Sequence, residues 1–233
     1  MTTKKLPDTK EVVCYVNLIG DRHRLYGIDS TEMAQILGDF IDTLSLNEDC
    51  LELTFTPSSV PIKQRWRSNR LSAHFVADYF SNFLPIDEDD PDRERRIKEA
   101  QGAVSYIANE LLENAMKFNY EQSSCKIKFG IHFLNESLSA HTNTVTAVIF
   151  VVNCITPEII EKFTTFIKEL LTSDPGELYV RQVERSIEED PKASGLGLLS
   201  MVNDYSAKLG WKLETSASEP PLTTVTTMVQ LQV

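Results

Sequence analysis

The sequence lacks the features of a membrane, secreted or metal-cluster protein. Its longest apolar run, residues 147–152, is far shorter than the roughly 20 residues of a membrane-spanning helix. The opening MTTKKLPDTKE contains no apolar segment of a secretory signal. The 4 cysteines include no CxxC pair, and the 4 histidines form no ligand-spaced pair. We therefore expect a cytoplasmic protein with free core thiols, no metal cluster and no membrane partner.

The chain also lacks an excess of positive charge. Its 23 lysines and arginines stand against 34 acidic residues, which gives a net charge of −11. A protein that binds nucleic acid or an anionic membrane needs a basic face, so the net charge disfavours both classes. It does not exclude a local basic pocket for a phosphate. The 42% apolar and 24% charged content of the 233 residues is typical of a globular chain with a substantial core.

Hydrophobic patterns predict a strand–helix–strand–helix region over residues 1–88. β-branched residues indicate a strand over 12–20, and apolar residues at helical spacing after an Asp-Ser-Thr cap predict a helix over about 29–44. Alternation predicts a strand over 50–56. The next helix, 67–84, carries apolar residues four apart: Leu71, Phe75, Tyr79 and Phe83. The acidic, proline-bounded stretch 85–92 is then expected to be a linker, or a loop that caps the next helix.

Residues 89–233 predict a second, larger domain. Its elements are expected to be a long helix (92–118), a hairpin (126–134 and 144–152), a helix (156–172), a long mobile segment with one short helix (173–194), a glycine turn and helix (194–210), and two strands around Pro220-Pro221. The fold class that follows is a two-layer α/β sandwich, with helices on one face of a mixed sheet.

The long helix carries a polar stripe. Glu110, Asn114 and Lys117 are spaced four and three residues apart, so they project from one helical face. A carboxylate, a carboxamide and an ammonium on one face suit a site for Mg²⁺ and a nucleotide. The alternative is an ordinary solvent-exposed face.

The second candidate feature is a glycine turn. Gly195 and Gly197 immediately precede a helix with apolar periodicity. Such a turn lets backbone N–H groups approach an anion at the positive end of the helix. The alternative is a tight turn packed on a sheet.

Together and in this order, NELLENAMKF, the hairpin, SGLGLLSMVNDYSAKLGWKLE and a threonine-rich last strand resemble the ATP-binding domain of the GHKL superfamily, over about residues 93–233. That resemblance implies a Bergerat-type fold. It makes Glu110 a general base, Asn114 a Mg²⁺ ligand and Lys117 a phosphate contact, with backbone phosphate contacts at Gly195 and Gly197. It also implies a base-proximal threonine at Thr226 or Thr224, and a lid at 173–194 that carries Arg181 and Arg185.

The chain departs from the superfamily at the adenine box. An Asp-x-Gly-x-Gly sequence is expected directly after the strand AVIFVV, but Asn153-Cys154-Ile155 stands there, and no glycine occurs between Gly130 and Gly176. The side-chain oxygen of Asn153 can still accept a hydrogen bond from an adenine amino group. Ile155 in place of a glycine is expected to reshape the floor of the pocket.

Two functions remain open from the sequence. One is a regulator resembling the anti-sigma serine kinases, which would bind ATP or ADP with Mg²⁺ and bind or phosphorylate a STAS-type antagonist. The other is a non-catalytic sensor or interaction module of the same fold, whose pocket is empty or holds another adenine-containing cofactor such as FAD. The resemblance also leaves a homodimer open.

Overall fold

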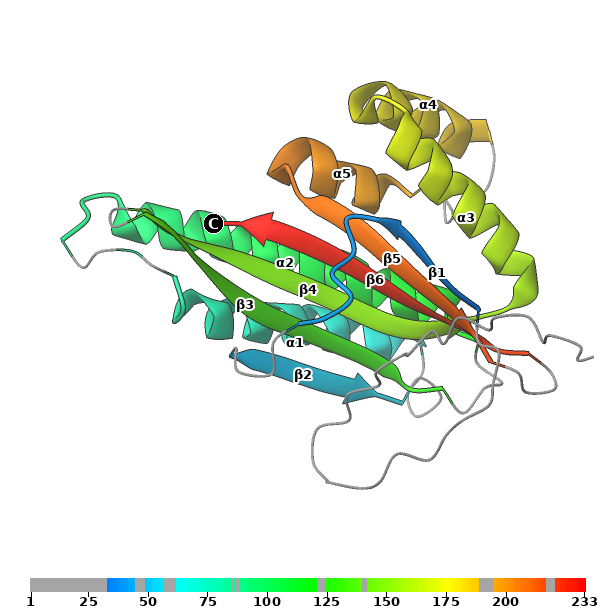
Figure 1. Ribbon diagram of the computed structural model, residues 1–233, viewed down its shortest axis with the longest axis horizontal. Helices are drawn as coiled ribbons and strands as arrows, with labels where there is room; N and C mark the ends of the chain where they lie inside the picture. Colours follow the sequence, from blue (N-terminus) through cyan, green and yellow to red (C-terminus); the bar gives the residue numbers. More distant parts are fainter. Residues whose placement is uncertain are drawn as a thin grey trace, which may run out of the picture. The chain divides into compact units, whose positions relative to one another are not determined.

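The core of the protein is a six-stranded sheet in the order β1-β5-β6-β4-β3-β2, in which every pairing is antiparallel (Figure 1). A computed structural model describes residues 33–44, 49–56, 62–84, 86, 89–120, 125–139, 142–188, 195–216 and 221–233. The strands are β1 (Met33–Gly38), β2 (Cys50–Phe55), β3 (Ile127–Ser139), β4 (Thr142–Ile155), β5 (Lys208–Thr215) and β6 (Thr223–Gln232). The strand predicted over 12–20 lies outside the described residues.

Five helices are described with this sheet. They are α1 (Ile62–Ser81), α2 (Arg93–Phe118), α3 (Pro157–Thr172), α4 (Pro175–Glu188) and α5 (Leu196–Tyr205). In Figure 1, α1 and α2 lie side by side behind the sheet. The two-layer α+β sandwich expected from the sequence is confirmed, with an antiparallel rather than a mixed sheet.

Strand alternation fixes which face of the sheet the helices cover. Ile131, Ile149 and Val229 lie at paired positions of β3, β4 and β6, and all three are buried in the core. The facing residues of α2, among them Ile107 and Leu111, are also buried. A face of this kind requires apolar residues at every second position, which these strands supply.

The region assigned to 1–88 contributes directly to this sheet. A compact unit runs from Thr31 to Val233, and β1, β2 and α1 belong to it. The helix expected over 29–44 is wrong where the structure describes it, because Met33–Gly38 is the edge strand β1, paired with β5. A short apolar run is compatible with either a helix or a strand, and here the pairing with β5 makes it a strand.

The chain leaves β1 at one edge of the sheet and returns as β2 at the other. Its described part after β1, residues 39–44, lies across the face opposite the helices (Figure 1). The Ile41 N–H donates to Met228 Sδ at 3.4 Å, and Lys212 Nζ lies 3.0 Å from Asp42 Oδ1. Gly210 leaves the room for this crossing, because a Cβ there would collide with the backbone of Phe40.

Helix α1 buries only part of the stripe expected, because Tyr79 and Phe83 pack against the core and the other two residues do not. The helix is confirmed, but Leu71 and Phe75 are 65% and 53% exposed. The buried residues are Ala73, Val76, Ala77 and Phe80. Small side chains such as Ala73 and Ala77 allow α1 to pack closely on α2, and Phe80 stacks on Phe133 of β3.

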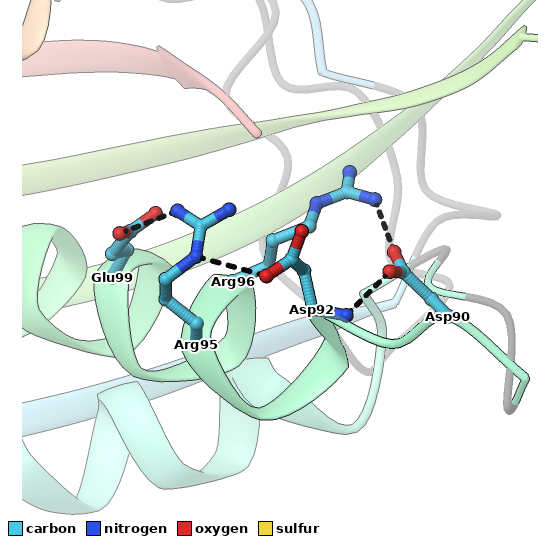
Figure 2. Close-up of polar contacts among 5 residues, drawn as sticks. All are labelled: Asp90, Asp92, Arg95, Arg96 and Glu99. Atoms are coloured by element: carbon cyan, nitrogen blue, oxygen red, sulfur yellow. Dashed lines mark hydrogen bonds and ion pairs between the residues drawn. The ribbon is translucent and has the colours of Figure 1, made fainter.

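The loop before α2 forms a set of polar contacts with the first turns of the helix (Figure 2). Asp90 Oδ1 accepts from the backbone N–H of Asp92 at 2.8 Å, and its Oδ2 lies 2.8 Å from Arg96 Nη1. Arg95 bridges Asp92 at 3.3 Å and Glu99 at 2.9 Å. The capping loop expected before this helix is therefore present at Asp90, whose pKa is lowered by the Asp92 backbone hydrogen bond and by Arg96.

Several element boundaries differ from the expectation. The hairpin strands β3 and β4 are longer than predicted, because β3 continues to Ser139 and β4 begins at Thr142. The segment 173–194 contains the helix α4 of 14 residues, rather than one short helix in a mobile stretch. Helix α5 ends at Tyr205 and not at Gly210, which lies inside β5. Ser206, in the left-handed conformation, caps α5 through its N–H.

The expectation of free thiols is wrong for two cysteines. Cys125 and Cys154 form a disulfide, with their Cα atoms 6.2 Å apart. Cys50 is a free, half-buried thiol. Spacing along the sequence gave no sign of the bond, because Cys125 and Cys154 meet only when β3 pairs with β4.

Candidate functional site

A cavity of about 520 Å³ opens between α2, α3, the start of α5, the end of β4 and the start of β6. It brings together six of the residues that the sequence analysis selected: Glu110, Asn114, Lys117, Asn153, Gly195 and Gly197. Its size falls within the range of roughly 300–1,000 Å³ that is usual for small-molecule sites.

The α2 wall is polar. Glu110, Asn114 and Lys117 face the cavity from successive turns, and Glu113 borders it. Burial raises the pKa of the Glu110 carboxyl, and repulsion from Glu113 adds to the rise, while Lys117 opposes it. The Lys117 ammonium lies 4.9 Å from the centre of the Phe118 ring. This wall therefore offers an acid, an amide and a cation within one helical face.

The floor comes from the ends of two paired strands. Asn153 and Ile155 of β4 line it, and both are buried, with 6% and 3% exposed. Val225 and Thr227 of β6 complete it. Ile155 therefore does occupy floor space where the superfamily pattern has a glycine.

The threonine at the cavity is Thr227 and not Thr226. Thr226 pairs with Val152 and Lys212, and so lies on the opposite face of β6, together with Thr224. Because side chains alternate along a strand, an error of one residue in the register moves the predicted side chain to the other face.

The glycine turn lies at the N-terminus of α5. Gly195 has φ +63° and precedes the first helical residue, which is the left-handed geometry that glycine tolerates best. A Cβ at Gly195 would collide with the ring of Phe166, and a Cβ at Gly197 would collide with the carboxylate of Glu110. Both glycines thus allow close approach of neighbouring side chains to the start of α5.

Helix α3 contributes a wall that the sequence analysis missed. Ile159, Lys162, Phe163 and Phe166 line the cavity from its first turns. The available signal was the position of α3, which begins two residues after the floor residue Ile155, together with apolar residues at spacings of four and three. Lys162 adds a second cation to the site.

The two arginines of the expected lid lie elsewhere. Arg181 Nη2 is 4.0 Å and Arg185 Nη1 is 3.4 Å from the carboxylate of Glu169 on α3, and neither arginine lines the cavity. These ion pairs join α4 to α3 at the surface. In this arrangement Arg181 and Arg185 neutralise Glu169.

Within the part of the chain that the structure describes, no group of three histidine, cysteine or acidic side chains is arranged to hold a metal ion. None of the described helices has the length and apolarity needed to cross a bilayer. The cavity itself combines two cations, two carboxylates, two carboxamides and a glycine turn with apolar walls. Such a site suits a ligand that has an apolar ring at one end and anionic groups at the other.

No protein-family model and no curated protein matches the sequence. Among solved structures, a chain in the crystal structure of the SiaB–SiaC complex from Pseudomonas aeruginosa is similar, with a TM-score of 0.42 and 14% sequence identity. The match covers 78% of the present chain and 89% of that chain. A likeness at this level carries no argument about what the present protein binds.

Proposed function

We propose that this protein is a nucleotide-binding regulator that takes ATP or ADP with Mg²⁺ and acts on a partner protein. The observation that carries the proposal is the convergence of Asn114, Asn153 and the Gly195–Gly197 turn on one cavity, from three separate elements. Each of these groups could contact a different part of a nucleotide. The resemblance of the sequence to the GHKL pattern supports the same ligand.

The phosphate end of the ligand fits the start of α5. Backbone N–H groups of the first helical turn have no partner within the helix and carry partial positive charge. Gly195 and Gly197 add no side chain of their own over these groups, and Lys117 supplies a full positive charge from the α2 wall of the same cavity. Anion binding at such a helix N-terminus needs no further device.

The purine end fits the floor. Asn153 is buried there and offers both an acceptor and a donor, so it can pair with an amino group and a ring nitrogen together. Ile155, Ile159 and Phe163 provide apolar surface for the ring. The amide thus replaces the aspartate of the GHKL pattern with a neutral group of similar size.

A Mg²⁺–nucleotide would supply phosphoryl groups whose charge the metal neutralises. Asn114 offers one protein oxygen to the metal, which fits the preference of Mg²⁺ for few protein ligands and several waters. Glu110 is placed beside it on the same face, and its raised pKa makes it a stronger base than an ordinary carboxylate once it is ionised. Glu110 is therefore the residue that would accept a proton from an attacking hydroxyl.

A second function is favoured by two observations. Ile155 takes floor space, and the carboxylate of Glu110 lies against Gly197, where an anion would have to approach. Both features favour a binding module without phosphoryl transfer, or one that holds a different adenine-containing ligand such as FAD. In either case we propose that the protein binds a partner, for which the serine-kinase resemblance suggests a STAS-type antagonist.

The test begins with release of any copurifying ligand by heat and its identification by mass and absorbance. The stripped protein is then titrated with ATP, ADP and Mg²⁺ by calorimetry, and Asn114→Ala is compared with wild type. We expect Asn114→Ala to weaken Mg²⁺-dependent nucleotide binding at least tenfold, because the metal loses its protein oxygen.

Asn109→Ala is the matched control, since it removes the same amide from the same helix outside the cavity lining. It should bind nucleotide as wild type does. Equal affinity in Asn114→Ala and wild type would overturn the Mg²⁺ assignment. A flavin spectrum in the released ligand, or no binding of any adenine nucleotide, would favour the second function.

A further inference from the structure

We propose that Cys125 and Cys154 are a reversible redox-modification site that fixes the floor of the cavity. The two cysteines are joined as a disulfide, and Cys154 stands between Asn153 and Ile155, two of the β4 residues that line the cavity. The effect on ligand binding rests on the function proposed above, whereas the effect on the floor itself does not.

Cys154 is the residue around which the end of α2 is anchored. Its backbone N–H donates to Asn119 Oδ1 at 3.0 Å, and its backbone carbonyl accepts from the Tyr120 N–H at 2.8 Å. The side chain of Asn119 is buried, with 6% exposed. The segment from Asn119 to Cys125 is thus bound to Cys154 at both of its ends, by hydrogen bonds at one and by the disulfide at the other.

The disulfide controls one of these two attachments. The Cys154 side chain lies on the sheet face opposite the cavity, beside the hydroxyl of Thr224 at 3.7 Å. With the bond formed, β4 is held at Cys154 through both its backbone and its side chain, and Asn153 and Ile155 have a fixed neighbour between them. With the bond broken, the Asn119 and Tyr120 hydrogen bonds remain, and the attachment through Cys125 is lost.

The exposure of the two sulfur-bearing residues sets the order of reaction. Cys125 is half-buried at the start of β3, whereas Cys154 is 1% exposed. The Cys125 thiolate attacks one sulfur of a low-molecular-weight disulfide such as oxidised glutathione, which releases one glutathione thiolate and leaves a mixed disulfide. The Cys154 thiolate then attacks the Cys125 sulfur and releases the second glutathione. Two protein thiols are oxidised and one glutathione disulfide is reduced to two thiols.

The oxidised form should bind nucleotide more tightly. A floor that is fixed before binding does not have to be ordered by the ligand, so less of the interaction free energy is lost. Coupling between two sites in one protein is commonly about fivefold or more in affinity. By reciprocity, bound nucleotide should make the Cys125–Cys154 disulfide harder to reduce by the same factor.

The experiment equilibrates the full chain at graded ratios of reduced to oxidised glutathione. Thiols are then alkylated, and the modified cysteines are mapped by mass spectrometry of peptides. As the buffer becomes more oxidising, we expect alkylation of Cys125 and of Cys154 to disappear together, in one two-electron transition. Hydrogen exchange of peptides covering residues 150–156 should be slower in the oxidised form, and the affinity for ADP with Mg²⁺ about fivefold or more higher.

Cys50→Ser is the matched control, because Cys50 is a free thiol on β2. It should leave the transition, the exchange and the ADP affinity unchanged. Cys125→Ser should abolish all three redox effects, and because Cys125 is half-buried this variant can be read even if Cys154→Ser does not fold. Independent labelling of Cys125 and Cys154 at every ratio, or identical exchange of 150–156 in both forms, would overturn the proposal.

The two proposals can fail separately. If ADP binds to neither form, the proposed nucleotide function fails, and the labelling and exchange results still decide the redox site. If ADP binds equally to both forms while the exchange differs, the floor is redox-sensitive but the coupling to the ligand is refuted.

Discussion

The carboxylate of Glu110 lies against the Cα of Gly197, in the space that a side chain at position 197 would need. An acidic side chain from the middle of α2 is thus held at the N-terminus of α5. Tyr106 of α2 and Tyr205 of α5 stack with ring centres 5.4 Å apart and secure the same pair of helices. The position of Glu110 is therefore set by the packing of α2 on α5.

Glu110→Gln should be more stable than wild type at neutral pH. Burial holds the pKa of Glu110 above its ordinary value of 4.5, so the folded state binds this proton more tightly than the unfolded state does. The resulting stability is complete below the unfolded pKa and is lost as the pH rises through the folded pKa. Glutamine keeps the shape and does not titrate. Urea denaturation from about pH 4 to pH 8 should give curves that diverge with rising pH. A less stable Glu110→Gln at pH 8 would contradict this.

Alanine should be tolerated far better at Gly197 than at Gly195. At Gly197 the colliding atom is the end of the flexible Glu110 side chain, and alanine favours the helix, so we expect a change below about 1 kcal/mol. At Gly195 the left-handed φ of +63° and the Phe166 ring both oppose a Cβ, which should cost about 1–3 kcal/mol. Denaturant unfolding of the two variants measures the difference, and equal losses would refute the geometry of the turn.

Phe133→Ala should destabilise the protein strongly, by about 3–5 kcal/mol. Phe133 is 1% exposed, and its ring stacks on Phe83 at 4.4 Å and on Phe80 at 5.6 Å between centres. Phe75→Ala is the control, because that ring is 53% exposed, and a loss below about 1 kcal/mol is expected. Thermal and urea unfolding would measure both changes in the free energy of unfolding. A large loss of stability in Phe75→Ala would instead indicate that Phe75 is buried, as the sequence predicted.

Gly210→Ala and Gly102→Ala should have opposite signs. A Cβ at Gly210 would meet the backbone of Asp39 and Phe40, which cannot move without disturbing the crossing segment, so a loss of about 1–3 kcal/mol is expected. Gly102 lies exposed inside α2 with open space around it, and alanine there should stabilise by about 0.5–1 kcal/mol. If Gly210→Ala were neutral, residues 39–40 would not lie against β5.

The long helix and the residues that α2 contributes to the cavity could be read from the sequence. A run of amphipathic periodicity with polar residues at 110, 114 and 117 fixes a helix and one of its faces, because both depend on spacing within a few turns. The glycine turn is local in the same way. Asn153 was identified because it directly follows a strand with an unambiguous apolar run.

Features that depend on contacts between residues far apart in the chain could not be predicted from the sequence. Residues 33–38 become a strand because β5 accepts them, and nothing within those six residues says so. Thr227 rather than Thr226 faces the cavity because of the register in which β6 pairs with β4. The sequence of β6 alone does not reveal that register. The exposure of Leu71 and Phe75 likewise reflects the side from which α2 approaches α1.

The position of β6 in the strand order has a consequence for synthesis of the chain. This strand, the last described in sequence, alone bridges β5 to β4, so the sheet consists of two unconnected parts until residues 223–232 have left the ribosome. The strands β2, β3 and β4 can pair beforehand, whereas β1 can pair only after β5, far along the chain, has been made. Contacts so distant in sequence slow folding. Until β6 is available, the edge of β4 that pairs with it therefore leaves its backbone N–H and C=O groups without their strand partners.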